Sequence, residues 1–148
     1  MIQYTQGIFT MKGVSFKIPD NFLINCSPEG TNEYFMEILP PDQSYMLRIY
    51  IFEDCMTTEQ EVSHEISEDA GGIALQPLAE VDIDGMKGHQ IFVRGANTPL
   101  EIFRLHASLR EGSSDHLRLF VQTCHPNHIQ DIYQSEDFQW FLKNIRHI

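Results

Sequence analysis

The sequence predicts a single α+β domain, in which helices are packed on an antiparallel β-sheet. Three observations support this class: strand-like segments dominate the chain, short turn signals separate them, and only two segments have helical periodicity. No repeat, low-complexity stretch or linker interrupts residues 1–148, so one domain is expected over the whole chain. A chain of this length buries roughly 70% of its unfolded surface and needs no disulfide or metal to hold a core.

Short strands are expected in the first third of the chain. Residues 8–18 predict two strands around a turn at Lys12-Gly13, and Pro19 ends the second strand. The turn-forming residues in 21–32 predict a loop, and residues 34–39 predict a strand that ends at Pro40-Pro41. Residues 45–52, rich in Tyr, Ile and Phe, give the clearest strand signal.

A helix is expected over residues 58–70. Thr58 and Glu61 have the spacing of a capping box, and Gly71-Gly72 provides the stop. The apolar stripe of this helix is thin, so most of its surface, including an acidic face with Glu61, is expected to be solvated.

The second half of the chain predicts a β meander followed by a helix. Strands are expected over residues 75–83, 89–94, 100–110 and 116–123, with a tight turn at Asp84-Gly85. Ser135 is the expected N-cap of the last helix. Its apolar face consists of Phe138, Phe141, Leu142 and Ile145.

Side chains alternate across a strand, so each long strand can be divided into two faces. One face is apolar throughout and is expected to form the core under the C-terminal helix; it contains Leu47, Ile49, Ile51, Ile91, Val93, Phe103, Leu105, Ala107, Leu109, Leu117, Leu119 and Val121. The opposite face carries four of the six arginines, interleaved with aromatic residues. Its candidate partner-binding residues are Arg48, Tyr50, Phe92, Arg94, Arg104, Arg118 and Phe120.

Arginine and aromatic residues dominate the energetics of many protein interfaces, because they provide planar donors and a large contact area. The functional interpretation is therefore a sheet face that binds a partner. The alternative is that the arginines pair with acids on neighbouring strands, such as Glu80, Asp82 and Glu101, in a solvated face.

Charge and cysteine content restrict the partner and the compartment. Ten Lys and Arg against 21 Asp and Glu give a net charge of −11, which disfavours nucleic acid and anionic membranes as partners. Cys26, Cys55 and Cys124 are an odd number at wide spacing, so no disulfide framework is expected. A secretion signal and a long apolar run are both missing, so we expect a cytoplasmic protein.

A second hypothesis concerns Cys124, His125 and His128, which place three possible soft-metal ligands within five residues. A structural zinc site needs four ligands, and no second cluster completes this one. The hypothesis is a small-ligand or metal-dependent protein, with hydrolase activity as one form. No other catalytic motif is found, and no cofactor is expected.

The order of elements resembles a known superfamily. The residues that carry the resemblance are Phe16-Lys17-Ile18-Pro19, Thr57-Thr58-Glu59, the turn at Asp84-Gly85 and the apolar face of the last helix. The superfamily includes the photosystem PsbP proteins, the Ran-binding Mog proteins and the bacterial DcrB-like proteins, and this chain resembles the DcrB-like branch in length. The resemblance implies an α/β/α sandwich around an antiparallel sheet and a binding function. Some DcrB-like members are cytoplasmic chaperones of secreted effectors.

The sequence therefore predicts a non-enzymatic, cytoplasmic, bacterial binding domain that docks a protein or peptide partner in a chaperone-like or adaptor-like role. An edge strand of the sheet could also pair across a two-fold axis, so a homodimer is a further expectation.

Overall fold

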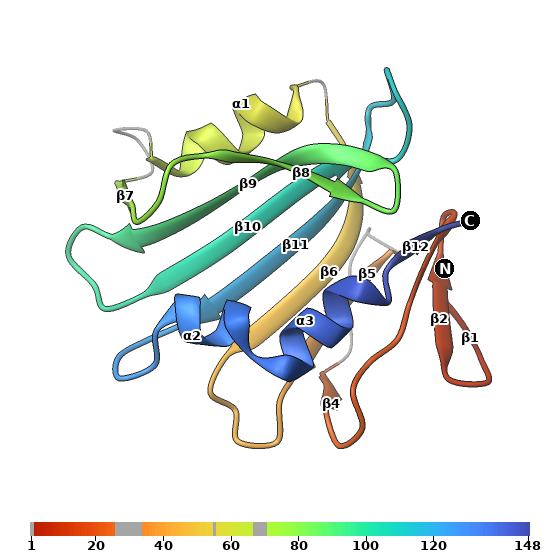
Figure 1. The fold of residues 1–148 in the computed structure, drawn as a ribbon, viewed down its shortest axis with the longest axis horizontal. Coiled ribbons are helices and arrows are strands. Elements are labelled where there is room, and N and C mark those ends of the chain that lie inside the picture. Colours follow the sequence, from red (N-terminus) through yellow and green to blue (C-terminus); the bar gives the residue numbers. More distant parts are fainter. Residues whose placement is uncertain (1, 26–33, 55, 67–70) are drawn as a thin grey trace.

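Two antiparallel sheets and three α-helices form the part of the chain that the computed structural model describes, which is residues 2–25, 34–54, 56–66 and 71–148 (Figure 1). The smaller sheet has the strand order β1-β2-β3-β12. Its strands are β1 (Gln3–Thr5), β2 (Ile8–Met11), β3 (Val14–Phe16) and β12 (Arg146–His147). It joins the N-terminal hairpins to the end of the chain.

The larger sheet has the order β4-β5-β6-β11-β10-β9-β7, and β8 also pairs with β9. Its long strands alternate between buried and exposed side chains, as expected for a sheet with two different faces. The strands are β4 (Leu23–Asn25), β5 (Phe35–Leu39), β6 (Met46–Glu53), β7 (Gly72–Ala74), β8 (Ala79–Ile83), β9 (Met86–Gly95), β10 (Glu101–Ser108) and β11 (Asp115–Thr123).

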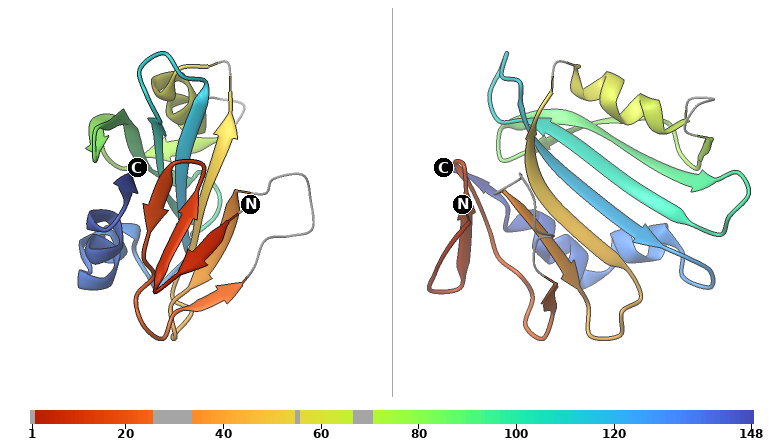
Figure 2. Two further views of the ribbon diagram at one scale, coloured as in Figure 1. Left: turned by 90° about the vertical axis from the view of Figure 1, so that its right-hand side faces the viewer. Right: turned by 180° about the vertical axis from the view of Figure 1, so that it is seen from behind.

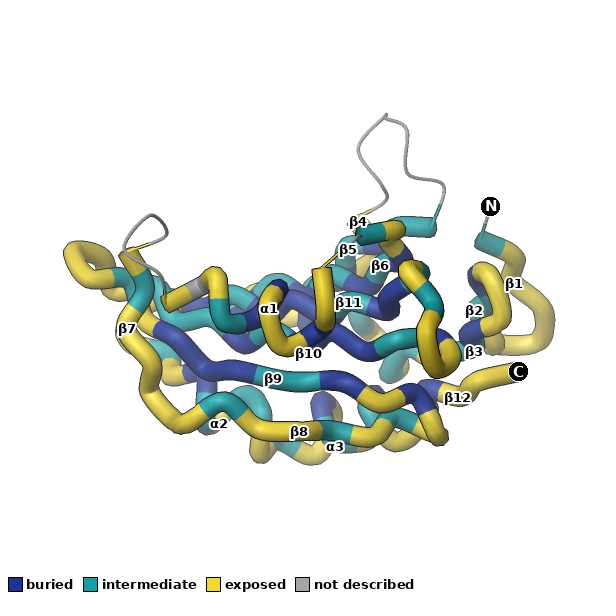
Figure 3. The backbone as a smooth tube through the Cα atoms, turned by 90° about the horizontal axis from the view of Figure 1, so that it is seen from above, coloured by how far each residue is buried: buried dark blue, intermediate teal, exposed yellow. Residues whose placement is uncertain are grey.

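Helices lie on both sides of this sheet (Figures 1 and 3). On one side lie α2 (Ile129–Gln134) and α3 (Glu136–Lys143). On the other side α1 (Thr58–Ser63) packs on β9 and β10 and continues as a 3-10 turn (His64–Ile66). The arrangement is the expected α+β sandwich. No described helix is both long and apolar enough to cross a membrane.

The main core lies between the larger sheet and α2 and α3. Phe103 on β10 meets Phe138 on α3 edge to face, with ring centroids 5.8 Å apart. Tyr133 on α2 packs on both rings, and Phe141 connects this core to Phe16 of the smaller sheet. A separate, small apolar cluster joins α1 to the opposite face of the sheet; it contains Val62, Ile91 and Val93 with Leu78 and Ile102.

Several predictions are confirmed. The hairpins turn at Lys12-Gly13 and Asp84-Gly85, where both residues of each pair have positive φ, as a two-residue I′ turn requires. Ser135 caps α3 by accepting a hydrogen bond from the backbone N–H of Phe138.

Other predictions are wrong in part. Leu23–Asn25 forms strand β4 inside the expected loop, and residues 26–32 of that loop lie outside the described residues. The helix predicted over 58–70 is regular only from Thr58 to Ser63, and its last four residues are likewise not described. The strand predicted over 75–83 is regular only as β8 (Ala79–Ile83). Strand β7 (Gly72–Ala74) precedes the predicted range and was not expected, and neither was α2. The capping box is formed by Thr57 and Gln60, one residue before the predicted pair.

Candidate functional site

The sheet side that carries α1 has a partly uncovered half. Here α1 packs on β9 and β10, and no described helix covers β5, β6 and β11 (Figure 2, right, and Figure 3). Pairing between strands arranges the side chains of this half in two rows. One row runs Glu37, Arg48, Phe120, Arg104; the next runs Phe35, Tyr50, Arg118, His106.

Arginines and aromatic rings alternate in these rows and stack on one another. The guanidinium of Arg104 lies 4.7 Å from the ring centroid of Phe120, and that of Arg48 lies 5.5 Å from the same centroid. Arg118 lies 4.5 Å from the centroid of Phe52. These are cation–π distances, and the stacking holds the guanidinium groups in place. We call this surface the arginine–aromatic face; its members are Phe35, Arg48, Tyr50, Phe52, Arg104, Arg118 and Phe120.

The arginines of this face differ in exposure and pairing. The Nε of Arg48 donates to Glu37 over 2.9 Å, and the Arg48 side chain is 41% exposed. Arg118 is mostly buried and donates to Asp54 over 2.8 Å and to Glu61 over 3.0 Å. Arg48 can therefore contact another molecule, whereas Arg118 belongs to the internal structure.

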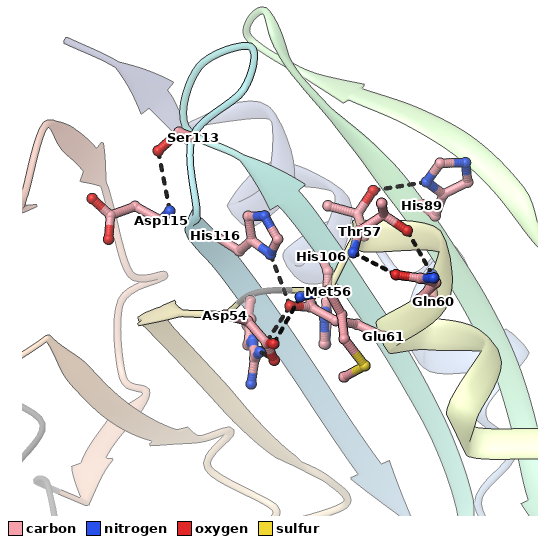
Figure 4. A network of polar contacts seen from close by, with 12 residues as sticks. Asp54, Met56, Thr57, Gln60, Glu61, His89, His106, Ser113, Asp115 and His116 are labelled. Carbon is pink, nitrogen blue, oxygen red and sulfur yellow. Dashed lines mark hydrogen bonds and ion pairs between the residues drawn. The ribbon is translucent and has the colours of Figure 1, made fainter.

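Glu61 is the centre of a buried polar cluster beside the arginine–aromatic face (Figure 4). Its carboxylate accepts hydrogen bonds from three strand residues: Nδ1–H of His106, Nδ1–H of His116 over 2.8 Å, and the guanidinium of Arg118. The Glu61 side chain is only 2% exposed. A buried carboxylate is tolerated only when its oxygens are paired in this way.

The charge states of the cluster follow from burial and pairing. Burial alone would raise the pKa of Glu61, but hydrogen bonds from His106 and His116 and the charge of Arg118 lower it below its ordinary value, so this carboxylate is ionised at neutral pH. Burial lowers the pKa of His106, which outweighs the opposing effect of Glu61, so this imidazole is neutral. Its Nδ1 carries the proton, and its Nε2 has no hydrogen-bond partner among the described residues.

Polar contacts therefore anchor α1 to three neighbouring strands. Thr58 Oγ1 bonds to His89 Nδ1 on β9 over 2.8 Å, while Glu61 reaches β10 and β11. Strands β9 and β10 approach each other closely beside these contacts. A Cβ on Gly88 would lie 1.8 Å from the carbonyl oxygen of His106, so this position requires glycine. The helix that borders the arginine–aromatic face is thus fixed by charge as well as by the Val62 cluster.

Five of the seven candidate residues lie together on this face, and two do not. Phe92 lies opposite Phe103 in the register of β9 and β10 and packs in the main core. Arg94 lies opposite Glu101, on the same side of the sheet as Phe92. The predicted faces of β9 are therefore reversed. The physical reason is that β9 is covered on both sides: Ile91, Phe92 and Val93 are all buried, so the strand has no hydrophobic alternation to show its orientation.

The alternative explanation for the arginines, pairing with acids, is found for Arg48 and Arg118. Arg48 pairs with Glu37, and Arg118 pairs with Asp54 and Glu61. Of the acids that this alternative named, Glu101 lies opposite Arg94 in the register of β9 and β10. Glu101 accepts hydrogen bonds from the backbone N–H of Ile129 and from His128.

The residues of the second hypothesis do not form a metal centre. Cys124, His125 and His128 are exposed, and no group of three possible metal ligands occurs within the described parts of the chain. Cys26 and Cys55 lie outside the described residues.

Sequence reasoning missed the Glu61 cluster. Glu61 was expected at a solvated helix surface, although it is the residue that faces the sheet. The available signal was histidine on the face opposite the core: His106 and His116 alternate with the apolar positions of β10 and β11.

The antiparallel sheet lies between helices, and the fold is an α/β/α sandwich of the PsbP/Mog type. The Ran-binding protein Mog1p of Saccharomyces cerevisiae has this fold, and its crystal structure superposes on the chain with a TM-score of 0.58. The match covers 91% of this chain and 90% of Mog1p at 10% sequence identity, so it shows the fold alone. No protein-family model matches the sequence, and no curated protein does. Membership of the DcrB-like branch stays a prediction.

Proposed function

We propose that this chain is a non-enzymatic protein-binding domain, and that the arginine–aromatic face docks a partner segment bearing carboxylate and apolar side chains. One observation carries the proposal: arginines stack on aromatic rings across a sheet face of which β5, β6 and β11 are covered by no described helix. A covered sheet face would be apolar, and a merely solvated one would have little reason to carry so many rings.

The carboxylate preference follows from the donors of Arg48. Glu37 occupies its Nε, and the two terminal NH2 groups remain as donors for a second acceptor. Stacking on Phe35 and Phe120 excludes water from the faces of the guanidinium and restricts its motion. A carboxylate that pairs with it therefore meets a preorganised and weakly hydrated cation.

The apolar preference follows from the rings at the edge of the face. Phe52 is 46% exposed, and Phe35 and Tyr50 are partly exposed and pack against each other at 5.8 Å between centroids. Rigid aromatic side chains of this kind lose little entropy on binding and provide large contact areas. A partner with apolar side chains beside its carboxylates would cover them.

The structural neighbour supports a binding function in general terms. Mog1p is described as a Ran-binding protein, and the likeness to it extends over nearly the whole chain. The identity of the partner does not follow from this likeness, so the proposal names only the partner's chemistry.

Affinity capture with two matched variants tests this proposal. Arg48→Gln removes the exposed guanidinium of the face, and Arg94→Gln makes the same change on the opposite side of the sheet. We expect Arg48→Gln to weaken retention of a stoichiometric partner by about 30-fold, which corresponds to the roughly 2 kcal/mol of an interface hot spot. Arg94→Gln should retain it. A partner that binds both folded variants equally would contradict the assignment of this face.

A further inference from the structure

A second surface lies away from the arginine–aromatic face, where the segment joining β3 to β4 runs between the N-terminal hairpin and α3 (Figures 1 and 2). Two hollows of about 620 and 770 Å³ open there. Both are lined by Pro19, Asp20 and Trp140, so the two hollows adjoin at these residues, and we call them together the Trp140 groove.

The first hollow of the Trp140 groove is rich in aromatic residues. Its lining includes Tyr4, Phe9 and Phe22 together with Trp140, and Lys17 and Asp20 are its charged members. Tyr4 is 62% exposed and Trp140 is 42% exposed, although each has a large apolar ring. The wall is nevertheless ordered, because Tyr4 packs on Phe9 at 4.6 Å and Phe9 stacks on the buried Phe16 at 5.4 Å. Exposed rings on a firm support are suited to contact with another molecule.

The second hollow is acidic. Asp20, Glu136 and Asp137 line it, and Lys143 is the only base among its lining residues. Among the described residues none of the three acids forms an ion pair. A cationic group next to the aromatic hollow would therefore meet three exposed carboxylates that form no ion pair with any described residue.

We propose that the Trp140 groove binds a proline-rich segment of a partner protein, in the polyproline II conformation and with a Lys or Arg at one end. Proline rings pack flat on aromatic faces, and a polyproline II segment is already stiff, so it loses little entropy on binding. Such a segment has no internal hydrogen bonds, and the indole N–H of Trp140 and the hydroxyl of Tyr4 are donors for its carbonyl groups. The basic residue enters the acidic hollow and fixes the direction of the segment.

This inference is independent of the arginine–aromatic face, since the two surfaces share no residue. The groove could be occupied while the face is empty, and a variant of one surface should leave the other unaffected. The chain would then hold its partner at two places, or hold two partners.

The test uses a fluorescently labelled ten-residue peptide with two Pro-x-x-Pro repeats and two arginines at one end, followed by anisotropy. Two matched peptides replace the arginines by glutamate or the prolines by alanine. We expect saturable binding of the first peptide to the wild-type chain and at least ten-fold weaker binding of the other two. Trp140→Ala should weaken the first peptide at least ten-fold, whereas Arg48→Gln should leave its affinity unchanged.

Three results of the peptide titrations would overturn the proposal. They are no saturable binding below about 1 mM, equal affinity for the alanine peptide, and equal affinity of the Trp140→Ala variant. The Trp140→Ala chain is expected to fold because the side chain is exposed, and circular dichroism checks this. A concentration-dependent dimer in sedimentation that Trp140→Ala abolishes would also overturn it, in favour of a second copy of this chain as the occupant.

Discussion

Replacing Glu61 by alanine should strongly destabilise the fold, because it leaves two buried imidazole N–H groups without their acceptor and removes one of the two carboxylates that pair with Arg118. Removing one partner from a buried charge pair costs about 3–5 kcal/mol. That is a large part of the roughly 5–15 kcal/mol by which a domain is stable. For a chain near 150 residues each kcal/mol lowers Tm by about 2–4 °C, so a decrease of about 6–20 °C is expected.

Glu59→Ala is the matched control, since it removes an exposed carboxylate from the same helix and should change the free energy of unfolding by only about 0.5 kcal/mol. Both variants are compared with the parent by urea denaturation and by thermal melting, followed by circular dichroism. Equal midpoints for Glu61→Ala and Glu59→Ala would refute the view that a buried carboxylate holds α1 on the sheet.

Three further predictions concern the core and the polar cluster. The free energy of unfolding should fall as the pH drops below about 6.5, because burial lowers the pKa of His106 from 6.5 and the unfolded chain then takes up a proton that the folded chain does not. The lowered pKa of Glu61 adds a further loss below pH 4.5, and a urea midpoint that is unchanged between pH 7 and pH 4 would contradict both statements. Gly88→Ala should cost about 1–3 kcal/mol or more, because the new methyl group meets backbone of β10, and an unchanged Tm would contradict that close approach. Phe138→Ala should cost about 3–5 kcal/mol in urea denaturation, whereas Trp140→Ala on the same helix should cost under about 1 kcal/mol; equal losses would contradict the packing of α3.

The long strands were predictable because each has one buried face. On β6, β10 and β11 the apolar side chains alternate with polar ones, and the pattern alone identifies the core. The strand β9 lacks this alternation because helices cover both of its sides, so its faces could not be told apart. The helix α2 was not recognised because it is one and a half turns long and His128, its N-cap, makes no capping hydrogen bond with its side chain.

The candidate site was predictable in part. The cross-strand rows of arginine and aromatic residues follow from strand register, and the sequence showed them on β6, β10 and β11. The role of Glu61 did not follow, because the predicted capping box assigned its side chain to the start of the helix, a position that Gln60 takes in the structure. Local spacing favoured Thr58 and Glu61 as a capping box, but the contacts of Glu61 with three strands are formed only in the folded chain.

Photo-crosslinking tests the docking role of the arginine–aromatic face most directly. A photoreactive amino acid is placed at Phe52, which is exposed on the face, or at the equally exposed Ile73, which pairs with Arg94 on the other side of the sheet. We predict that the Phe52 position crosslinks one protein in cells, that Arg48→Gln abolishes this product, and that Arg94→Gln preserves it. A crosslink from Ile73 alone, or one from Phe52 that survives Arg48→Gln, would contradict the proposed docking face.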